Sequence, residues 1–206
     1  MFGKNSKWIT FDSSLQSVDV FGEFYLQRAE NVYIEICGLG YFELYVNGAP
    51  VSNDKFVPAW SNYCARNGRK LLYPNTDVMK NRAYYLRYDL RGVARAGENK
   101  LLVKLGNGWF RQTERNVEGD NSYSNKLYLR YEIFEDKKSA GGSCNACTYR
   151  ANEIVKNNVY FGETQDFSRK NADNSNPAKE TKPAQETTLK TRLYLQKCPA
   201  DKPIKR

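Results

Sequence analysis

The side chains able to carry acid–base chemistry in this 206-residue sequence do not include histidine, because none occurs. That absence excludes Ser-His-Asp and Cys-His arrangements, together with the commonest metal ligand and the usual general base near neutral pH. Catalysis would have to rest on carboxylates, tyrosine, lysine or cysteine. Glu163 and Asp166 form an acidic cluster near Tyr160. For this cluster we predict pairing with Arg111 or another basic loop residue rather than a general acid–base pair.

The thiols form a second group of reactive side chains. The five cysteines are Cys37, Cys64, Cys144, Cys147 and Cys198. Cys144 and Cys147 make a single C-x-x-C pair, which lacks two ligands of a structural zinc site and lacks the βαβ setting of a thioredoxin-like site. We therefore predict that all five are free thiols in a reducing compartment.

Charge is distributed unevenly along the chain, whose net charge is +9. Residues 168–206 hold ten Lys and Arg against four Asp and Glu, whereas residues 1–167 hold twenty-two against nineteen. Most of the excess positive charge thus belongs to a polar C-terminal region, which favours a solvated tail over a nucleic-acid surface. A nucleic-acid site would also need basic and aromatic residues on one strand face. The alternation from Tyr128 to Phe134 supplies these but is interrupted by Glu132.

Strands must position any functional side chain, because apolar residues recur at every second position. In 31–36, Val32, Ile34 and Ile36 share one face, and an Asn-Gly pair at 47–48 indicates a tight hairpin turn. The other predicted strands cover 20–26, 41–46, 84–89, 101–105, 126–134 and 189–195.

The pattern predicts an all-β fold, an antiparallel sandwich of two stacked sheets. One short helical turn is predicted over 89–97, with Asp89 as N-cap and Gly97 following its end. The segment 168–187 is rich in Asn, Lys, Pro and Ala and is predicted to be a polar linker or disordered loop.

Several motifs occur in a characteristic order. They are G-L-G-Y-F-E-L-Y-V-N-G (38–48), V-P-A-W-S-N-Y (57–63), Y-D-L (88–90), G-E-N-K-L (97–101), L-G-N-G-W-F-R (105–111) and N-N-V-Y-F-G-E-T-Q-D (157–166). Together they resemble the N-terminal accessory domain of bacterial α-L-rhamnosidases, over about residues 7–166.

The resemblance implies a galactose-binding-like jelly roll that assists substrate recognition or packs beside a catalytic barrel. The family's catalytic carboxylates lie in a later (α/α)₆ barrel, to which nothing in this sequence corresponds, so we expect no hydrolase activity from this chain alone. We predict a β-sandwich accessory domain over 1–167, the linker over 168–187, and a terminal strand with a lead-in to a following domain over 188–206.

The resemblance also implies a ligand site. In some family members an acidic–amide pair binds L-rhamnose together with Ca²⁺, and Asn53 and Asp54 occupy that position here. Asn107 could approach them as a third metal ligand, and Trp60 and Trp109 could offer apolar faces to a sugar ring. The alternative is that Asn53 and Asp54 are ordinary turn residues and that the two indoles pack in a core or an interface.

These observations leave three functions open. The first is recognition of an L-rhamnose-containing glycan, the second is structural packing without a ligand, and the third is nucleic-acid binding, which the sequence disfavours. No signal peptide and no apolar run of membrane-spanning length is visible, so we expect a cytoplasmic location, or a secreted one if a leader has been trimmed.

Overall fold

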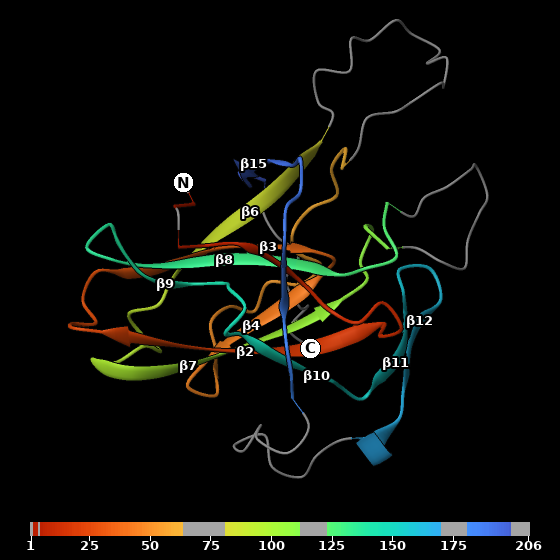
Figure 1. The fold of residues 1–206 in the computed structure, drawn as a ribbon, viewed down its shortest axis with the longest axis horizontal. Helices are drawn as coiled ribbons and strands as arrows, with labels where there is room; N and C mark the ends of the chain where they lie inside the picture. Colours follow the sequence, from red (N-terminus) through yellow and green to blue (C-terminus); the bar gives the residue numbers. More distant parts are fainter. Residues whose placement is uncertain (1, 4, 64–80, 112–122, 170–180, 199–206) are drawn as a thin grey trace, which may run out of the picture.

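Alternating apolar side chains form strands at the positions that the sequence predicts. The computed structural model describes residues 2–3, 5–63, 81–111, 123–169 and 181–198, and it consists mainly of strands (Figure 1). The strands are β1 (Trp8–Thr10), β2 (Ser17–Leu26), β3 (Val32–Leu39), β4 (Phe42–Val46), β5 (Ala49–Pro50), β6 (Arg82–Asp89), β7 (Gly97–Gly106), β8 (Tyr128–Glu135), β9 (Lys138–Gly142), β10 (Thr148–Ala151), β11 (Ile154–Asn158), β12 (Gly162–Gln165), β13 (Lys182–Pro183), β14 (Gln185–Thr187) and β15 (Arg192–Leu195).

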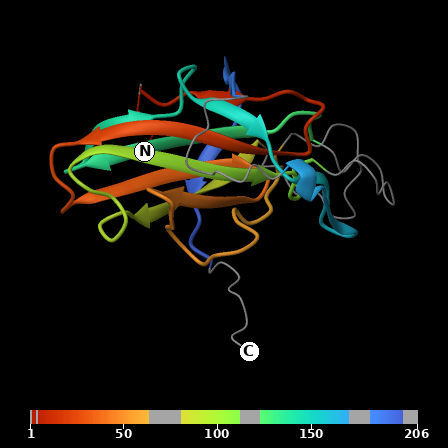
Figure 2. The ribbon, with the colours of Figure 1, turned by 90° about the horizontal axis from the view of Figure 1, so that it is seen from below.

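Two sheets stack face to face, as Figures 1 and 2 show. The seven-stranded sheet has the order β14-β1-β8-β3-β6-β15, with β9 beside β8, and the six-stranded sheet has the order β13-β10-β2-β7-β4-β5. Strands β11 and β12 form a separate two-stranded hairpin at one end of the sandwich. The predicted all-β sandwich is confirmed, except that β15 pairs with β6 in parallel.

The main core fills the space between the sheets. Ile34 and Ile36 of β3 enter it from one sheet, and Val103 and Leu105 of β7 enter it from the other, all fully buried. A second, smaller cluster lies on the opposite face of β3, where Cys37 and Leu39 pack with aromatic side chains. Because both faces of β3 are covered, the residues after Tyr33 are continuously buried instead of alternating.

Two carboxylates are buried on that second face. Glu35 of β3 lies opposite Glu132 of β8 in the strand register, and neither is accessible to solvent. Arg87 of β6 donates to Glu35 through Nη2 at 2.5 Å and Nε at 3.1 Å, and the backbone N–H of Gly3 donates to Glu132. These contacts with Arg87 and Gly3 partly offset the cost of burying like charges side by side.

The same face carries the residues on which the nucleic-acid hypothesis rested. The guanidinium of Arg130 lies over the Phe2 ring at 4.9 Å, and Phe134 stacks on Tyr33 with ring centroids 4.9 Å apart. These side chains are engaged within the protein, so this strand face is no open platform for stacking bases.

The predicted capped turn lies directly after β6. Asp89 accepts a hydrogen bond from the Arg91 backbone N–H at 3.0 Å, and Ala94 N–H donates to Leu90 carbonyl at 2.8 Å. This is a capped turn, but the chain forms no regular helix over 89–97, and Gly97 (φ 90°) already begins β7. A short 3₁₀ helix lies elsewhere, at Phe167–Arg169.

The C-terminal region also differs from its prediction. Strand β13 pairs with β10 in one sheet, and β14 pairs with β1 in the other, so residues 182–187 bridge both sheets and are not a linker. Backbone hydrogen bonds at a sheet edge depend little on side-chain type, which is why a polar segment can take this place. Residues 170–180 of the predicted linker lie outside the described residues. The division into domains remains a prediction.

One buried charge on β2 gives a pH-dependent prediction. Asp19 is 2% exposed, accepts a hydrogen bond from Asn152 at 3.1 Å and lies 3.5 Å from Arg150. Burial raises the pKa of Asp19 above its ordinary value of 3.8, in spite of these neighbours. Between pH 3.8 and the raised pKa, the folded state therefore binds more protons than the unfolded state.

We therefore expect Asp19 to stabilise the fold less as pH rises through this window. In urea unfolding from about pH 3 to about pH 7, the stability of the wild type minus that of Asp19→Asn should fall as pH rises. The amide keeps the acceptor for Asn152 and does not titrate, so the difference isolates Asp19. A difference that stays level, or that grows with pH, would contradict the raised pKa.

Candidate functional site

The end of the sandwich that carries the glycine motifs after β3 and β7 is built by backbone contacts. After β3, Gly40 adopts φ 134°, and after β7, Gly108 adopts φ 51°. An added Cβ would lie 1.9 Å from the Gly106 carbonyl oxygen at Gly40, and 2.7 Å from the Tyr41 backbone nitrogen at Gly108. The two chain segments thus approach so closely that only glycine fits, and this approach places Trp109 at the rim of the sandwich.

Two indoles meet at this rim. The Trp60 and Trp109 ring centroids are 6.2 Å apart, with an interplanar angle of 45°. Tyr160, from the turn between β11 and β12, packs edge-on against Trp109 at 5.5 Å. Trp60 is 54% exposed and Tyr160 is 42% exposed. We call these three residues the aromatic rim.

The Trp60 loop is held from two directions. The Val57 carbonyl accepts a hydrogen bond from the Phe42 N–H of β4 at 3.0 Å. The Ala59 N–H donates to Oε1 of Gln196, just beyond β15, at 2.8 Å. The C-terminal segment thus helps to position an indole that lies more than a hundred residues earlier in the sequence.

Asn107 has a different role from the predicted one. Its side chain is fully buried, and Nδ2 donates to Gln16 Oε1 at 2.6 Å and to the Asn157 carbonyl at 2.8 Å. Its backbone N–H donates to Asn157 Oδ1 at 2.8 Å. Asn107 therefore ties the end of β7 to β11, and this link holds the turn that carries Tyr160 beside Trp109.

The predicted acidic–amide pair lies in the loop after β5. Asn53 is exposed, and the Asp54 backbone N–H donates to Ser52 Oγ at 3.0 Å, which is an ordinary turn contact. The Asp54 carboxylate accepts a hydrogen bond from the Tyr88 hydroxyl of β6. The pKa of Tyr88 is raised, mainly by burial and to a lesser extent by this carboxylate.

These positions test whether the three predicted ligands fit a calcium ion. Asp54 is engaged with Tyr88, whereas Asn107 is engaged with Gln16 and Asn157. Within the described part of the chain the buried Oδ1 of Asn107 has no hydrogen-bond partner, while the Nδ2 of the same amide is held by Gln16 and Asn157. Among the described residues no three His, Cys, Asp or Glu side chains gather as a metal site. The set does not fit, and we derive no step through calcium.

A groove of about 560 Å³ opens beside the aromatic rim, between the β11–β12 hairpin and residues of β4 and β7. Tyr41 and Phe56 form an apolar wall, with ring centroids 5.5 Å apart. Charged side chains line the rest as ion pairs, Lys55 with Glu43 and Lys104 with Glu153.

The acidic groups of this groove are paired. Burial raises the pKa of Glu43, but hydrogen bonds from Lys55 and Tyr45 outweigh it and leave the pKa lowered. Asn157 Nδ2 donates to Glu163 at 2.6 Å. Asp166 pairs with Arg169 at 3.3 Å, as the sequence predicted for a basic loop residue. The predicted partner Arg111 was wrong, since its guanidinium donates to the carbonyls of Leu15 and Ser13.

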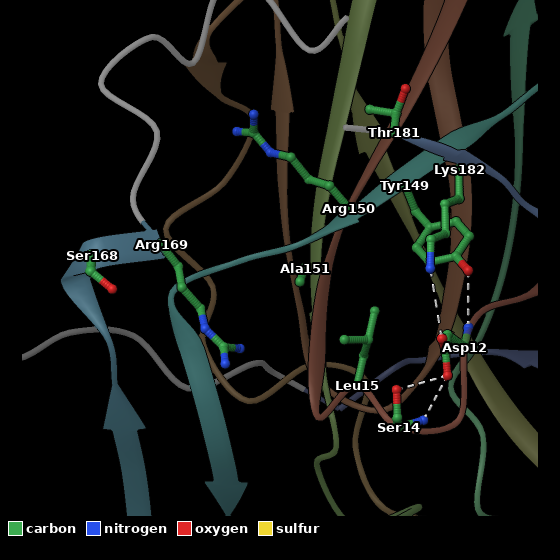
Figure 3. Close-up of a pocket in the computed structure, with 10 residues that line it drawn as sticks. All are labelled: Asp12, Ser14, Leu15, Tyr149, Arg150, Ala151, Ser168, Arg169, Thr181 and Lys182. Atoms are coloured by element: carbon green, nitrogen blue, oxygen red, sulfur yellow. Dashed lines mark hydrogen bonds and ion pairs between the residues drawn. The ribbon is translucent and has the colours of Figure 1, made fainter. Parts of the chain in front are cut away.

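A larger hollow, about 850 Å³, lies where β10 passes the segments at 12–15 and 181–182 (Figure 3). Arg150 and Arg169 line it, but Figure 3 shows their guanidinium groups pointing apart. They pair with Asp19 and Asp166, and Lys182 lies 4.0 Å from Asp12. Cations that diverge and are each paired do not make an anion site, so the aromatic rim is the better candidate.

Sequence reasoning found Trp60 and Trp109 but missed Tyr160 and the tie from Asn107 to Asn157. The signal for Tyr160 was the Asn pair at 157–158, because Asn158 Oδ1 accepts from the Tyr160 and Phe161 backbone N–H groups and shapes the turn. In the part of the chain that the structure describes, no helix has the length and hydropathy needed to cross a membrane.

Two stacked sheets with exposed aromatic side chains on their end loops define the class of protein, which is a jelly-roll β-sandwich domain. The chain belongs to the alpha-L-rhamnosidase N-terminal domain family, whose sequence profile matches residues 27–205. An alpha-L-rhamnosidase of Formosa agariphila is 29% identical over 148 residues, which cover 68% of this chain and 14% of that protein.

Solved structures show the same fold. The alpha-L-rhamnosidase of Dictyoglumus thermophilum superposes with a TM-score of 0.72 at 21% identity, covering 95% of this chain and 22% of that one. The Streptomyces avermitilis alpha-L-rhamnosidase, solved in complex with L-rhamnose, gives 0.69 at 19% identity, covering 86% of this chain and 16% of that one. This chain spans less than a quarter of each of these relatives.

Proposed function

We propose that this domain is a non-catalytic carbohydrate-recognition domain of an α-L-rhamnosidase-like glycoside hydrolase. The observation that carries the proposal is the exposed aromatic rim, in which Trp60, Trp109 and Tyr160 gather from three separate segments. Aromatic faces bind the C–H side of sugar rings. A domain that only binds the sugar needs no acid–base pair of its own. L-rhamnose is the sugar we assign, because one relative of the same fold was solved with it.

The proposed binding mode uses the neighbouring polar groups as well. The groove beside the rim presents paired carboxylates, amides and ammonium groups whose oxygens and N–H groups can meet sugar hydroxyls. Asn53 and Asp54 stay predicted contacts at the loop after β5. The reaction itself would belong to a catalytic (α/α)₆ barrel in the same polypeptide.

Titration with L-rhamnose tests the proposal. We expect wild-type protein to give a calorimetric binding signal at millimolar sugar, and Trp60→Ala to weaken binding about tenfold or more, because an exposed stacking face is lost. Both a calcium-containing and a chelator-containing buffer should be used, since the predicted calcium ligands do not converge. Binding in the chelator is the expected result.

Tyr25→Ala is the matched control, because Tyr25 is exposed to a similar extent, 63% against 54% for Trp60, but lies at the far end of β2 from Gly106. The control should bind as the wild type does. Absence of any heat in the wild type, or equal binding by Trp60→Ala, would contradict a sugar site at the rim. Clear hydrolysis of an aryl α-L-rhamnoside by the same sample would contradict the non-catalytic assignment.

A second candidate is a structural role without a ligand. Phe161 and Phe167, next to the β11–β12 hairpin, are 68% and 64% exposed, which suits packing against the following domain of a longer protein. A folded wild-type protein that binds no sugar in the titration would favour this second candidate over the first.

A further inference from the structure

The turn that leads into β10 brings two cysteines together. Cys147 N–H donates to the Cys144 carbonyl at 3.1 Å, so the two cysteines occupy the first and last positions of a β-turn. In such a turn the end Cα atoms lie within about 7 Å of each other. A disulfide requires about 4.4–6.8 Å between these atoms, so the backbone is already suitable for one.

The side chains also meet. The Cys144 and Cys147 thiols contact each other by a hydrogen bond, and both are free thiols in this structure. Two cysteines separated in sequence by two residues often do not face each other on a strand. Here the turn brings the two thiols within contact of each other.

Both ends of this turn are fixed. Before it, Ser143 Oγ donates to the Lys7 carbonyl at 2.6 Å and accepts from the Tyr131 N–H at 3.1 Å. After it, the Cys147 carbonyl accepts from the Ala184 N–H at 2.9 Å, and Cys147 Sγ lies 3.2 Å from the Tyr131 hydroxyl. The residues between them, Asn145 and Ala146, are exposed.

We propose that Cys144 and Cys147 are a modification site, a dithiol that a low-molecular-weight disulfide such as oxidised glutathione converts to an intramolecular disulfide. This site is independent of the sugar site. The turn also holds the segment 182–187, which bridges the two sheets, at two points. Ala184 is bonded to Cys147, and the Asn145 N–H donates to Glu186 at 3.1 Å.

The reaction proceeds in two exchanges. The Cys144 thiolate, which is the more accessible, attacks one sulfur of oxidised glutathione, expels one glutathione thiolate and leaves a mixed disulfide. Cys147 then loses its proton to solvent and attacks the Cys144 sulfur, which releases the second glutathione thiolate. Both released thiolates take up protons, so two cysteine thiols are oxidised while one disulfide is reduced to two thiols. Burial raises the pKa of Cys147, consistent with its acting second.

The other described cysteines cannot react in this way. Cys37 is fully buried, and burial raises the pKa of its thiol, while Cys198 is exposed without a neighbouring cysteine among the described residues. Among the described cysteines, the expected intramolecular disulfide is therefore the one between Cys144 and Cys147.

Peptide mapping tests the proposal. Trypsin releases residues 139–150 as one peptide, because Lys138 and Arg150 are the nearest cleavage sites and both cysteines lie between them. The full chain is treated with oxidised glutathione, denatured, alkylated and digested. We expect this peptide to lose the mass of two hydrogen atoms, to carry no alkyl group, and to regain two alkyl groups after reduction.

Matched variants complete the experiment. Cys198→Ser should form the same oxidised peptide as the wild type, whereas Cys144→Ser should keep an alkylated Cys147, and Cys147→Ala should stop at the glutathione adduct on Cys144. A wild-type peptide with two alkyl groups after oxidation, or with a persistent glutathione adduct, would overturn the proposal. Sugar binding by the reduced protein is measured separately, so failure here leaves the proposed function unaffected.

Discussion

Gly40→Ala is expected to lower the free energy of unfolding by about 3 kcal/mol or more, a large share of the total stability of a domain this size. Alanine would have to adopt φ 134°, which L residues avoid, and this alone costs about 1–2 kcal/mol. Its Cβ would also lie 1.9 Å from the Gly106 carbonyl oxygen. The Gly106 carbonyl belongs to the backbone and cannot rotate away as a flexible side chain could. The segments around Gly40 and Gly106 must therefore separate, and the loop that carries Trp109 moves with them.

Gly48→Ala is the matched control for this prediction. Gly48 also has a positive φ, of 80°, but an added Cβ there meets nothing within 4 Å. We expect a cost of about 1 kcal/mol, due to the backbone conformation alone. Urea unfolding of both variants, followed by tryptophan fluorescence, measures the difference. Equal costs would show that the close approach of Gly40 to Gly106 does not exist in solution.

Leu105→Ala is expected to cost about 2–5 kcal/mol of unfolding free energy. Leu105 is fully buried near the end of β7, in register with Val18 of β2 and Phe42 of β4. Truncation removes apolar contacts and leaves a cavity between the sheets, just before the chain turns into the Trp109 loop. We expect sugar binding to weaken as well, because the Trp109 loop loses the core packing of Leu105 directly before it.

The same substitution at Leu195 is the control, since that side chain is 39% exposed on β15. It should cost less than about 1 kcal/mol, because little apolar area returns to water. Leu105→Met keeps the volume and should cost less than about 1.5 kcal/mol. If Leu195→Ala lowered the stability as much as Leu105→Ala, the assignment of Leu105 to the buried core would be wrong.

The strands could be predicted because their signal is local. Val32, Ile34 and Ile36 alternate with other residues, and alternation alone assigns a strand and its core face. The burial of Glu35 could not be predicted in this way, because its partner Arg87 lies 52 residues later, on β6. Alternation marks one face as polar and does not reveal that a second layer covers it.

The candidate site shows the same division. Trp60 and Trp109 were recognisable as residues that could contact a sugar, and the structure brings their rings together. The structure also gives Asp54 and Asn107, which the family resemblance suggested as ligands of one ion, different partners within the protein. Where a side chain points at the end of a strand depends on the hydrogen bonds it finds, and Asn107 finds Asn157 and Gln16.

By itself, the sequence determined the all-β class, the main strands and the glycine positions that allow the tight rim, because these depend on local periodicity and backbone freedom. Only the tertiary structure decided that residues 182–187 bridge both sheets, that Tyr160 joins the two indoles, and that Cys144 faces Cys147. The physical reason is that pairing at sheet edges and contacts between loops join residues distant in sequence. Their geometry is set by the packed sheets and not by the neighbouring residues.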